Sequence, residues 1–275
     1  MDFPYRLAIV DMDDTLLDHD KQISAANLEA LARLRSAGME IVIASGRHYL
    51  NIAKFEEETG CEGWIISSAG AMVRHARTGE SLHELTLPSD LALEIRARAQ
   101  EAGHSLIAYH RTGIYVEQMT EWVRLDASRS GREPEFGDLR ELAQEGLLKL
   151  MWTTDAATIN SLHPVLAKDY HARAYVVHTE PEVIEFLSLE ANKARGAQAV
   201  VERLCIAREE IVAFGDGNND VPLLAWSGMS VAMDHGSAAA RQAARHVTPP
   251  GPHGEAFARA VNLILKLDRR REPRT

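Results

Sequence analysis

Apolar residues near the start of the chain form short runs that alternate with longer amphipathic segments. Residues 7–10 and 40–44 have the length and the β-branched content of strands that are buried on both faces. Between them, Ser24 is a suitable helix N-cap and Gly38 a suitable C-terminal stop for a helix of about thirteen residues. A strand, a helix and a strand of these lengths predict one right-handed crossover unit, in which the two strands run parallel.

The same pattern predicts further elements in two separate parts of the chain. In the first part we expect a helix over 48–59, a strand over 64–67 and a hairpin over 69–87. In the second part we expect a helix over 193–204, strands over 211–214 and 229–232, a helix over 237–244, a strand over 246–248 and a helix over 255–267. Together these elements are typical of one α/β domain.

The chain between these two parts has a different pattern of predicted helices and strands, which begins at Pro88. Helical runs over 91–102 and 156–167 alternate there with short strands over 114–117, 147–152 and 174–178, and residues 131–137 read as a loop. The sequence therefore predicts an α/β protein with a mostly parallel, Rossmann-like sheet flanked by helices in residues 1–86 and 189–275. We also expect an α+β domain inserted at residues 87–188.

Carboxylates follow two of the predicted strands of the sheet. Asp11 and Asp13 follow the first strand, and Asp216 and Asp220 follow the strand over 211–214. The carboxyl ends of parallel strands meet at one edge of a sheet, where α/β proteins bind their ligands. Ser45 ends the neighbouring strand and should lie beside Asp11. Taken alone, each acidic stretch also fits a solvated turn or a helix cap, but together they favour a site for a hard cation such as Mg²⁺.

Composition narrows the class of protein. The chain has 275 residues, of which 45% are hydrophobic and 25% are charged, as is ordinary for a globular protein. The net charge of −10 argues against a nucleic-acid partner. Cys61 and Cys205 lack the spacing of a metal or redox pair. The absence of a charged-then-apolar leader and of a long apolar run leads us to expect a cytoplasmic protein without a membrane partner.

Four short motifs, in this order, resemble those of the haloacid dehalogenase superfamily of phosphohydrolases. They are D-M-D-D-T from Asp11, S-G-R from Ser45, the lone Lys193, and G-D-G-N-N-D from Gly215. The position of the insertion resembles the Cof-like, or sugar-phosphatase-like, branch, whose members carry a large α/β cap. The resemblance extends over essentially the whole chain and implies a Mg²⁺-dependent phosphatase that acts on a small phosphorylated metabolite.

The resemblance also assigns roles to residues. Asp11 would attack phosphorus and form an aspartyl-phosphate, and Asp13 would act as general acid and base. Crowding by Asp11 and Asp14 should hold the pKa of Asp13 high enough for it to donate a proton. The implied metal ligands are Asp11, Asp13 through its backbone carbonyl, and Asp216, with Asp220 acting directly or through water. The implied phosphate ligands are Ser45, Gly46 through its amide, Lys193 and Asn219.

Several alternatives stay open at this point. Lys193 would also serve as a structural ion pair for Asp11, Thr15 would lie behind the metal ligands, and Arg47 would be a surface residue. Substrate-selecting residues in the cap are expected near His110, Arg111 and Tyr115. The same superfamily includes phosphotransferases and mutases, and a non-catalytic sensor of phosphate esters is a rival of a different class. The chain would be a monomer or a homodimer.

Four positions depart from the usual family pattern. Asp14 replaces the glycine that is commonest in the first motif, a change also familiar in this superfamily. Ala194 replaces a glycine after the lysine, Ala69 replaces an asparagine before Gly70, and Asp234-His235 replaces a glycine-asparagine pair after Met233. These last three changes leave the catalytic carboxylates untouched but weaken any transfer of a particular substrate preference.

Overall fold

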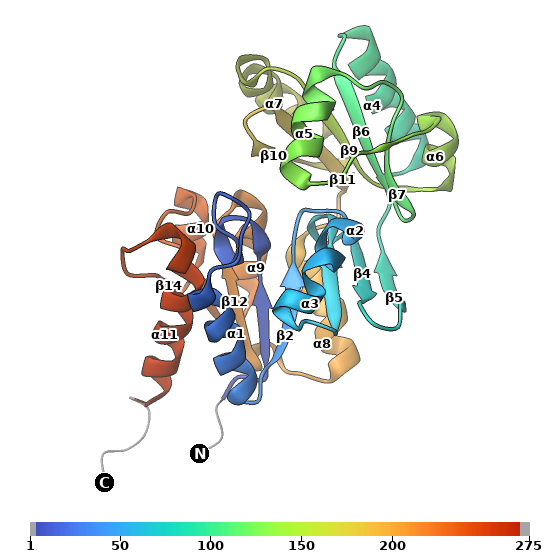
Figure 1. The fold of residues 1–275 in the computed structure, drawn as a ribbon. Helices are drawn as coiled ribbons and strands as arrows, with labels where there is room; N and C mark the ends of the chain where they lie inside the picture. The colour runs from blue at the N-terminus through green and yellow to red at the C-terminus, as the bar shows by residue number, and fades with distance from the viewer. Residues whose placement is uncertain (1–3, 270–275) are drawn as a thin grey trace.

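The computed structural model describes residues 4–269, which fold into two lobes, each with its own β-sheet (Figure 1). Within these residues the lower lobe holds an eight-stranded sheet in the order β14-β13-β12-β1-β2-β3-β4-β5, and the upper lobe a six-stranded sheet in the order β10-β11-β9-β6-β7-β8. The mostly parallel sheet predicted from the sequence is confirmed. Pairing is parallel from β14 through β3 and antiparallel for β4 and β5.

The lower lobe contains the two outer parts of the chain. Its strands are β1 (Leu7–Val10), β2 (Glu40–Ala44), β3 (Trp64–Ser67), β4 (Met72–His75), β5 (Ser81–Glu84), β12 (Ile211–Gly215), β13 (Met229–Ala232) and β14 (His246–Val247). Its helices are α1 (Ala25–Ser36), α2 (Tyr49–Ile52), α3 (Glu56–Thr59), α8 (Lys193–Leu204), α9 (Val221–Trp226), α10 (Ala238–Ala243) and α11 (Ala256–Arg269). The predicted helix over 48–59 is wrong in one respect, because a 3-10 turn at Ala53–Phe55 separates α2 from α3.

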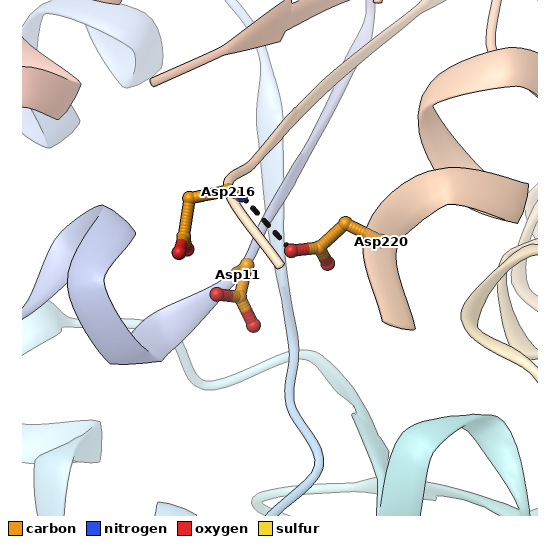
Figure 2. A group of neighbouring side chains, drawn as sticks. All are labelled: Asp11, Asp216 and Asp220. Carbon is orange, nitrogen blue, oxygen red and sulfur yellow. Dashed lines mark hydrogen bonds between the residues drawn. The ribbon is translucent and has the colours of Figure 1, made fainter. Parts of the chain in front are cut away.

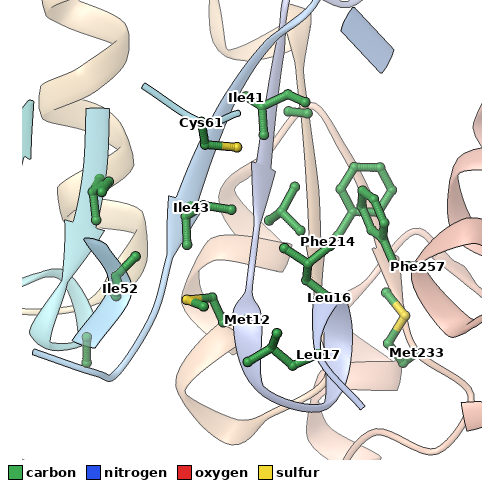
Figure 3. Packing of buried hydrophobic residues seen from close by; sticks show 14 of the residues in the cluster. Met12, Leu16, Leu17, Ile41, Ile43, Ile52, Cys61, Phe214, Met233 and Phe257 are labelled. Carbon is green, nitrogen blue, oxygen red and sulfur yellow. The ribbon is translucent and has the colours of Figure 1, made fainter. Parts of the chain in front are cut away.

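Strand β1 lies in the middle of this sheet, between β12 and β2. Alternate residues of β1 enter different cores, so that Leu7 and Ile9 pack under α8, α9 and α10 while Ala8 and Val10 pack under α1, α2 and α11. All four are fully buried. Figure 3 shows part of the second core, where the rings of Phe214 and Phe257 lie 5.2 Å apart. Burial on both faces explains why β1 is uniformly apolar and why polar residues begin where it ends.

Helix α1 begins and ends at the residues that the sequence indicates. The Ser24 side chain accepts a hydrogen bond from the backbone N–H of Asn27, as an N-cap should. Gly38 lies just beyond the helix with a φ of +82°, a conformation that favours glycine. The crossover from β1 through α1 therefore returns β2 parallel to β1, which brings their carboxyl ends together.

The upper lobe is built from the inserted segment. Its strands are β6 (Ser105–His110), β7 (Gly113–Val116), β8 (Glu135–Phe136), β9 (Leu147–Thr153), β10 (Ala174–Glu180) and β11 (Val183–Ser188), and its helices are α4 (Ser89–Glu101), α5 (Glu121–Ser130), α6 (Leu139–Glu145) and α7 (Ala156–Tyr170). These elements lie between β5 and α8 in the chain. We propose residues 87–188 as the inserted cap domain and residues 1–86 with 189–275 as the core domain.

Side-chain alternation gives the cap sheet two different faces. Leu150, Trp152 and Phe186 pack with α4, α6 and α7 into the core of the lobe. Their neighbours Lys149 and Glu185 point to the opposite face, which borders the lower lobe. Within residues 4–269, no helix combines the length and the apolar character that a membrane span requires. The cytoplasmic location stays a prediction.

Candidate active site

Three neighbouring strands of the lower lobe deliver the predicted polar residues to one edge of the sheet. Asp11 follows β1, Ser45 follows β2 and Asp216 follows β12. One carboxylate oxygen from each of Asp11, Asp216 and Asp220 lies within 4.8 Å of the other two, and Figure 2 shows the three side chains. The structure therefore brings together segments that are about 200 residues apart in the chain, as the strand-end argument predicts.

Asp220 organises the loop that follows β12. Its Oδ2 accepts hydrogen bonds from the backbone N–H groups of Asp216 at 3.0 Å and Gly217 at 2.9 Å. A Cβ atom at Gly215 would lie 2.5 Å from Cγ of Asp220, so only glycine leaves room for this carboxylate. Asp220 is fully buried. Its geometry fixes the position of Asp216, which is the more accessible of the two carboxylates.

Lys193 is fully buried at the start of α8 and donates hydrogen bonds to two of these carboxylates. Its Nζ contacts Oδ1 of Asp11 and lies 2.6 Å from Oδ1 of Asp220. Burial lowers the pKa of Lys193, but the charges of Asp11 and Asp220 raise it further, so its pKa lies well above the ordinary value. Lys193 is therefore a permanent cation beside Asp11.

Glycine at position 70 allows the turn after β3 to approach α8. Gly70 has a φ of +96°, and a Cβ atom there would lie 2.0 Å from the carbonyl oxygen of Asn192. Asn192 is the N-cap of α8 and accepts a hydrogen bond from the backbone N–H of Arg195. This close contact fixes the first turn of α8, and with it the position of Lys193.

The remaining carboxyl groups of the cluster are held in an environment that disfavours negative charge. Burial, followed by the charge of Asp220, raises the pKa of Asp11 well above its ordinary value. The same two causes raise the pKa of Asp216 to about 7, although Thr15 donates a hydrogen bond of 2.7 Å to its Oδ1. One lysine does not neutralise three acids. A divalent cation would favour their ionised forms.

The donors in this cluster fit Mg²⁺. Carboxylate oxygens are the hard ligands that this ion prefers, and it commonly binds through one or two carboxylates and retains water. The hydrogen bond from Thr15 leaves one oxygen of Asp216 open, and Oδ1 of Asp11 keeps a second lone pair beside the one that Lys193 uses, so Oδ2 of Asp11 is not needed for the metal. The side chain of Asp13 points away from the cluster, so a role for Asp13 in metal binding would fall to its backbone carbonyl, as the resemblance implies.

Asp13 is instead held by Arg47. The guanidinium Nε lies 2.8 Å from Oδ2 of Asp13 and Nη2 lies 2.6 Å from Oδ1, while Nζ of Lys21 lies 3.0 Å from Oδ1. Burial raises the pKa of Asp13, but Arg47 and Lys21 outweigh it and lower the pKa to about 2. The prediction of a raised pKa is wrong because these two cations outweigh the crowding by neighbouring acids. Arg47 is also not a surface residue, since it is only 8% exposed.

The predicted phosphate ligands lie at different depths. Gly46 and Asn219 line the cleft between the lobes, and a Cβ atom at Gly46 would lie 3.4 Å from Nδ2 of Asn219. Ser45 is fully buried behind them, where its Oγ accepts a hydrogen bond of 3.1 Å from the backbone N–H of Arg47. Ser45 therefore shapes the loop that presents Gly46 and Arg47.

The cleft above the carboxylates has a volume of about 440 Å³ and is roofed by the cap. The cap residues that line it include Tyr109, Asp126, Arg129, Lys149 and Glu185. The expectation that His110, Arg111 and Tyr115 face the substrate is wrong. On β6 the side chain of Tyr109 faces the cleft, so its neighbour His110 points away, and the Tyr115 hydroxyl lies 2.9 Å from that of Thr112.

Two of the departures from the family pattern share a backbone conformation. Asp14 has a φ of +57° and Ala69 a φ of +54°. Glycine, and to a lesser extent asparagine, adopts this left-handed conformation at low cost. The usual glycine and asparagine at these positions thus suit the left-handed backbone conformation. This chain keeps the same conformation with Asp14 and Ala69 in their place.

Comparison with known proteins agrees with the fold and with the motifs. The family model for haloacid dehalogenase-like hydrolases matches residues 8–260. The chain is 30% identical over 230 residues to an HMP-PP phosphatase of Serratia proteamaculans, covering 83% of this chain and 84% of the relative. It is 28% identical over 251 residues to a 5-amino-6-(5-phospho-D-ribitylamino)uracil phosphatase of Bacillus subtilis, covering 89% and 92%.

Solved structures show the same architecture. A haloacid dehalogenase-like hydrolase from Bacteroides thetaiotaomicron superposes with a TM-score of 0.81 at 25% identity, covering 94% of this chain and 99% of the other. A sugar phosphatase of subclass IIB superposes with a TM-score of 0.81 at 20% identity, covering 94% and 98%, which supports the fold alone. The chain belongs to the haloacid dehalogenase-like hydrolases. It is a phosphoric monoester hydrolase of the Cof-like branch.

Proposed function

We propose that this protein is a Mg²⁺-dependent phosphatase that hydrolyses a small phosphorylated metabolite through a phosphorylated Asp11. The observation that carries the proposal is the meeting of Asp11, Asp216 and Asp220 with Lys193 at the floor of a cleft that the cap covers. The relatives support the substrate class, because they are named as an HMP-PP phosphatase and as a 5-amino-6-(5-phospho-D-ribitylamino)uracil phosphatase.

Asp11 is positioned to act as the nucleophile. Lys193 holds its Oδ1, which leaves Oδ2 to form a bond to phosphorus as the ester P–O bond breaks. Asp11, the backbone carbonyl of Asp13, and Asp216 would hold Mg²⁺, which offsets the negative charge between the carboxylate and the phosphate. Asp220 maintains the position of Asp216 and the charge balance of Lys193.

Asp13 would transfer protons in both halves of the reaction. In the first half it would protonate the leaving alcohol, and in the second it would accept a proton from the water that attacks the phosphorylated Asp11 and breaks the bond to its oxygen. The ionised form that Arg47 stabilises suits the second half. For the first half, the anionic phosphate must compete with Asp13 for the Arg47 guanidinium, and this competition raises the pKa of Asp13 when substrate is bound.

The phosphate oxygens would be held by groups around the mouth of the cluster. Gly46 through its amide and Asn219 through its side chain line the cleft directly, while Lys193 approaches from behind Asp11. Ser45 would act by fixing the turn that carries Gly46. The cap limits access of water to this volume, which favours transfer of the phosphoryl group to Asp11 before hydrolysis.

The test is phosphate release from p-nitrophenyl phosphate and from a panel of metabolite monoesters, in Mg²⁺ buffer without any other acceptor. We expect wild-type protein to release inorganic phosphate and Asp11→Asn to lose turnover, because an amide is a poor nucleophile toward phosphorus. Asp20→Asn, at an exposed acid outside the cluster, is the matched control. Transfer of the phosphoryl group to a sugar hydroxyl without release of phosphate would instead identify a phosphotransferase, and tight binding of esters without turnover would identify a sensor.

A further inference from the structure

A second polar cluster lies across the cleft from Asp11, on the underside of the cap. Glu185 on β11 and Lys149 on β9 are 5% and 1% exposed and form an ion pair of 2.7 Å. Asp126 on α5 lines the same part of the cleft. None of these residues takes part in the phosphoryl chemistry proposed above, and buried charges of this kind are costly unless they are paired and fully hydrogen-bonded.

Glu185 has one oxygen engaged and one free. Its Oε1 accepts the hydrogen bond from Lys149, whereas its Oε2 is buried and has no hydrogen-bond partner within residues 4–269. Buried carboxylate oxygens in native proteins are almost always hydrogen-bonded. Because Glu185 lines the cleft, a donor from a bound molecule would complete the hydrogen bonding of this carboxylate.

The cations on this side of the cleft are already paired within the protein. Lys149 donates to Glu185 and, at 2.9 Å, to the carbonyl oxygen of Gly46, and its Nζ lies 4.4 Å from the ring centroid of Tyr109. Arg129 forms an ion pair of 2.7 Å with Glu182. Both cations therefore have a carboxylate partner already, and an anionic part of a substrate would have to compete with Glu185 or Glu182 for them.

Asp126 adds a second acceptor with no cation of its own. No ion pair involves Asp126 in the part of the chain that the structure describes, residues 4–269. Burial raises its pKa to about 6; the charge of Lys149 opposes this rise and the charge of Glu185 adds to it. With Glu180 also lining the cleft, the acids on the cap side outnumber the unpaired cations, so the subsite attracts N–H and O–H donors and repels anions.

We infer that Glu185 and Asp126 form a leaving-group subsite that selects substrates whose alcohol portion carries ammonium or hydroxyl donors and no additional negative charge. This inference rests on the proposed phosphatase function and specifies its substrate class. Lys149 is a positioning residue, since it orients Glu185 and links it to the Gly46 turn that borders the phosphate. A ligand that satisfies Glu185 thus stabilises the same contact that holds the cap against the core.

The test compares three sugar esters of similar size that differ in charge: glucosamine 6-phosphate, glucose 6-phosphate and 6-phosphogluconate. We expect kcat/KM of the wild type to fall in that order. In Asp126→Asn and in Glu185→Gln, the preference for the amine over the carboxylate should fall by roughly tenfold, the value of one charge-assisted hydrogen bond. Asp169→Asn, an exposed acid of the same lobe on α7, should keep the wild-type ratio.

A wild-type preference for 6-phosphogluconate, or an unchanged ratio in both variants, would overturn the inference while leaving the phosphatase function in place. Absence of phosphate release from every ester, including p-nitrophenyl phosphate, would instead overturn the proposed function and the inference with it. Thermal unfolding of each variant verifies folding. Because Asp126 has no ion pair to lose, Asp126→Asn gives a usable result even where Glu185→Gln is unstable.

Discussion

Arg47, which follows β2, donates two hydrogen bonds, of 2.8 and 2.6 Å, to the carboxylate of Asp13, which follows β1. Such a two-point contact is specific to the guanidinium group and strongly favours the ionised carboxylate. The general acid implied by the family motifs is therefore ionised at neutral pH in the free protein. Asp13 can take up a proton more easily when a bound phosphate competes with it for the guanidinium of Arg47.

Replacing Arg47 should raise the pKa of Asp13. In Arg47→Ala we expect the pKa to rise from about 2 toward or above the ordinary value of 3.8, because burial then opposes only Lys21. The pH dependence of the Asp13 carboxyl carbon resonance measures this directly. Arg47→Lys keeps the positive charge but loses the two parallel hydrogen bonds, so it should give a smaller rise. A pKa of Asp13 that stays at about 2 in Arg47→Ala would show that Arg47 does not lower it.

Removal of Asp216 should abolish Mg²⁺ binding. A ligand that binds only the folded state raises the melting temperature, so Mg²⁺ should stabilise the wild type against heat. Asp216→Asn should lose this Mg²⁺-dependent shift, since an amide is a weaker ligand than a carboxylate, and Asp20→Asn should retain it. The measurement needs no substrate. An equal shift in Asp216→Asn and the wild type would place the metal elsewhere.

Lys193 should contribute strongly to stability because it is buried between two carboxylates. Loss of one partner of a buried ion pair costs about 3–5 kcal/mol, since the remaining charges stay uncompensated. We expect Lys193→Met to lower the free energy of unfolding in urea by about this amount. Lys168→Met, at an exposed lysine of α7, should change it little. Equal stability of the two variants would show that the carboxylates need no cation from the chain.

His48 should make the protein less stable in mild acid. Its Nε2 donates to the carbonyl of His110 at 2.8 Å and its Nδ1 accepts from the N–H of Leu50, so the fully buried ring is neutral. Burial lowers its pKa from 6.5 to about 4. As the pH falls through this window, the unfolded chain takes up the proton first, and stability declines by up to about 3 kcal/mol.

Urea unfolding at several pH values tests this account of His48. The free energy of unfolding of the wild type should fall relative to that of His48→Gln between pH 6.5 and about 4. Above pH 6.5 the difference between the two free energies should stay constant. Glutamine is the matched replacement, because its amide can still donate to the His110 carbonyl and does not titrate. A difference between the two proteins that is constant over the whole range would show that His48 is not the titrating group.

The fold and the floor of the site follow from the sequence for a simple reason. A strand such as β1 that is buried on both faces must be apolar throughout, so the first carboxylate after it marks the edge of the sheet. Parallel neighbours then carry Ser45 and Asp216 to the same edge without any further information. These positions depend on chain order and strand direction, both of which leave a pattern in the sequence.

The parts that sequence reasoning missed depend on side-chain direction. The sequence alone predicts Arg47 as a surface residue, because nothing in S-G-R shows that its side chain reaches from the end of β2 to Asp13 at the end of β1. The cap residues were misplaced by one position on β6, where His110 and Tyr109 face opposite ways and a slip of one residue exchanges the faces. The sequence gives a weak signal for Lys149 and Glu185, since each is a charged residue inside a mostly apolar strand.

The most direct test of the central claim is to trap the phosphoryl group on Asp11. Asp13→Asn should slow hydrolysis of the intermediate, so that acid-quenched protein incubated with Mg²⁺ and p-nitrophenyl phosphate gains the mass of one phosphoryl group. We expect peptide mass spectrometry to locate that group on Asp11 and to find none when Asp11→Asn is added to the same variant. A phosphoryl group on another residue, or turnover by Asp11→Asn at the wild-type rate, would contradict the account.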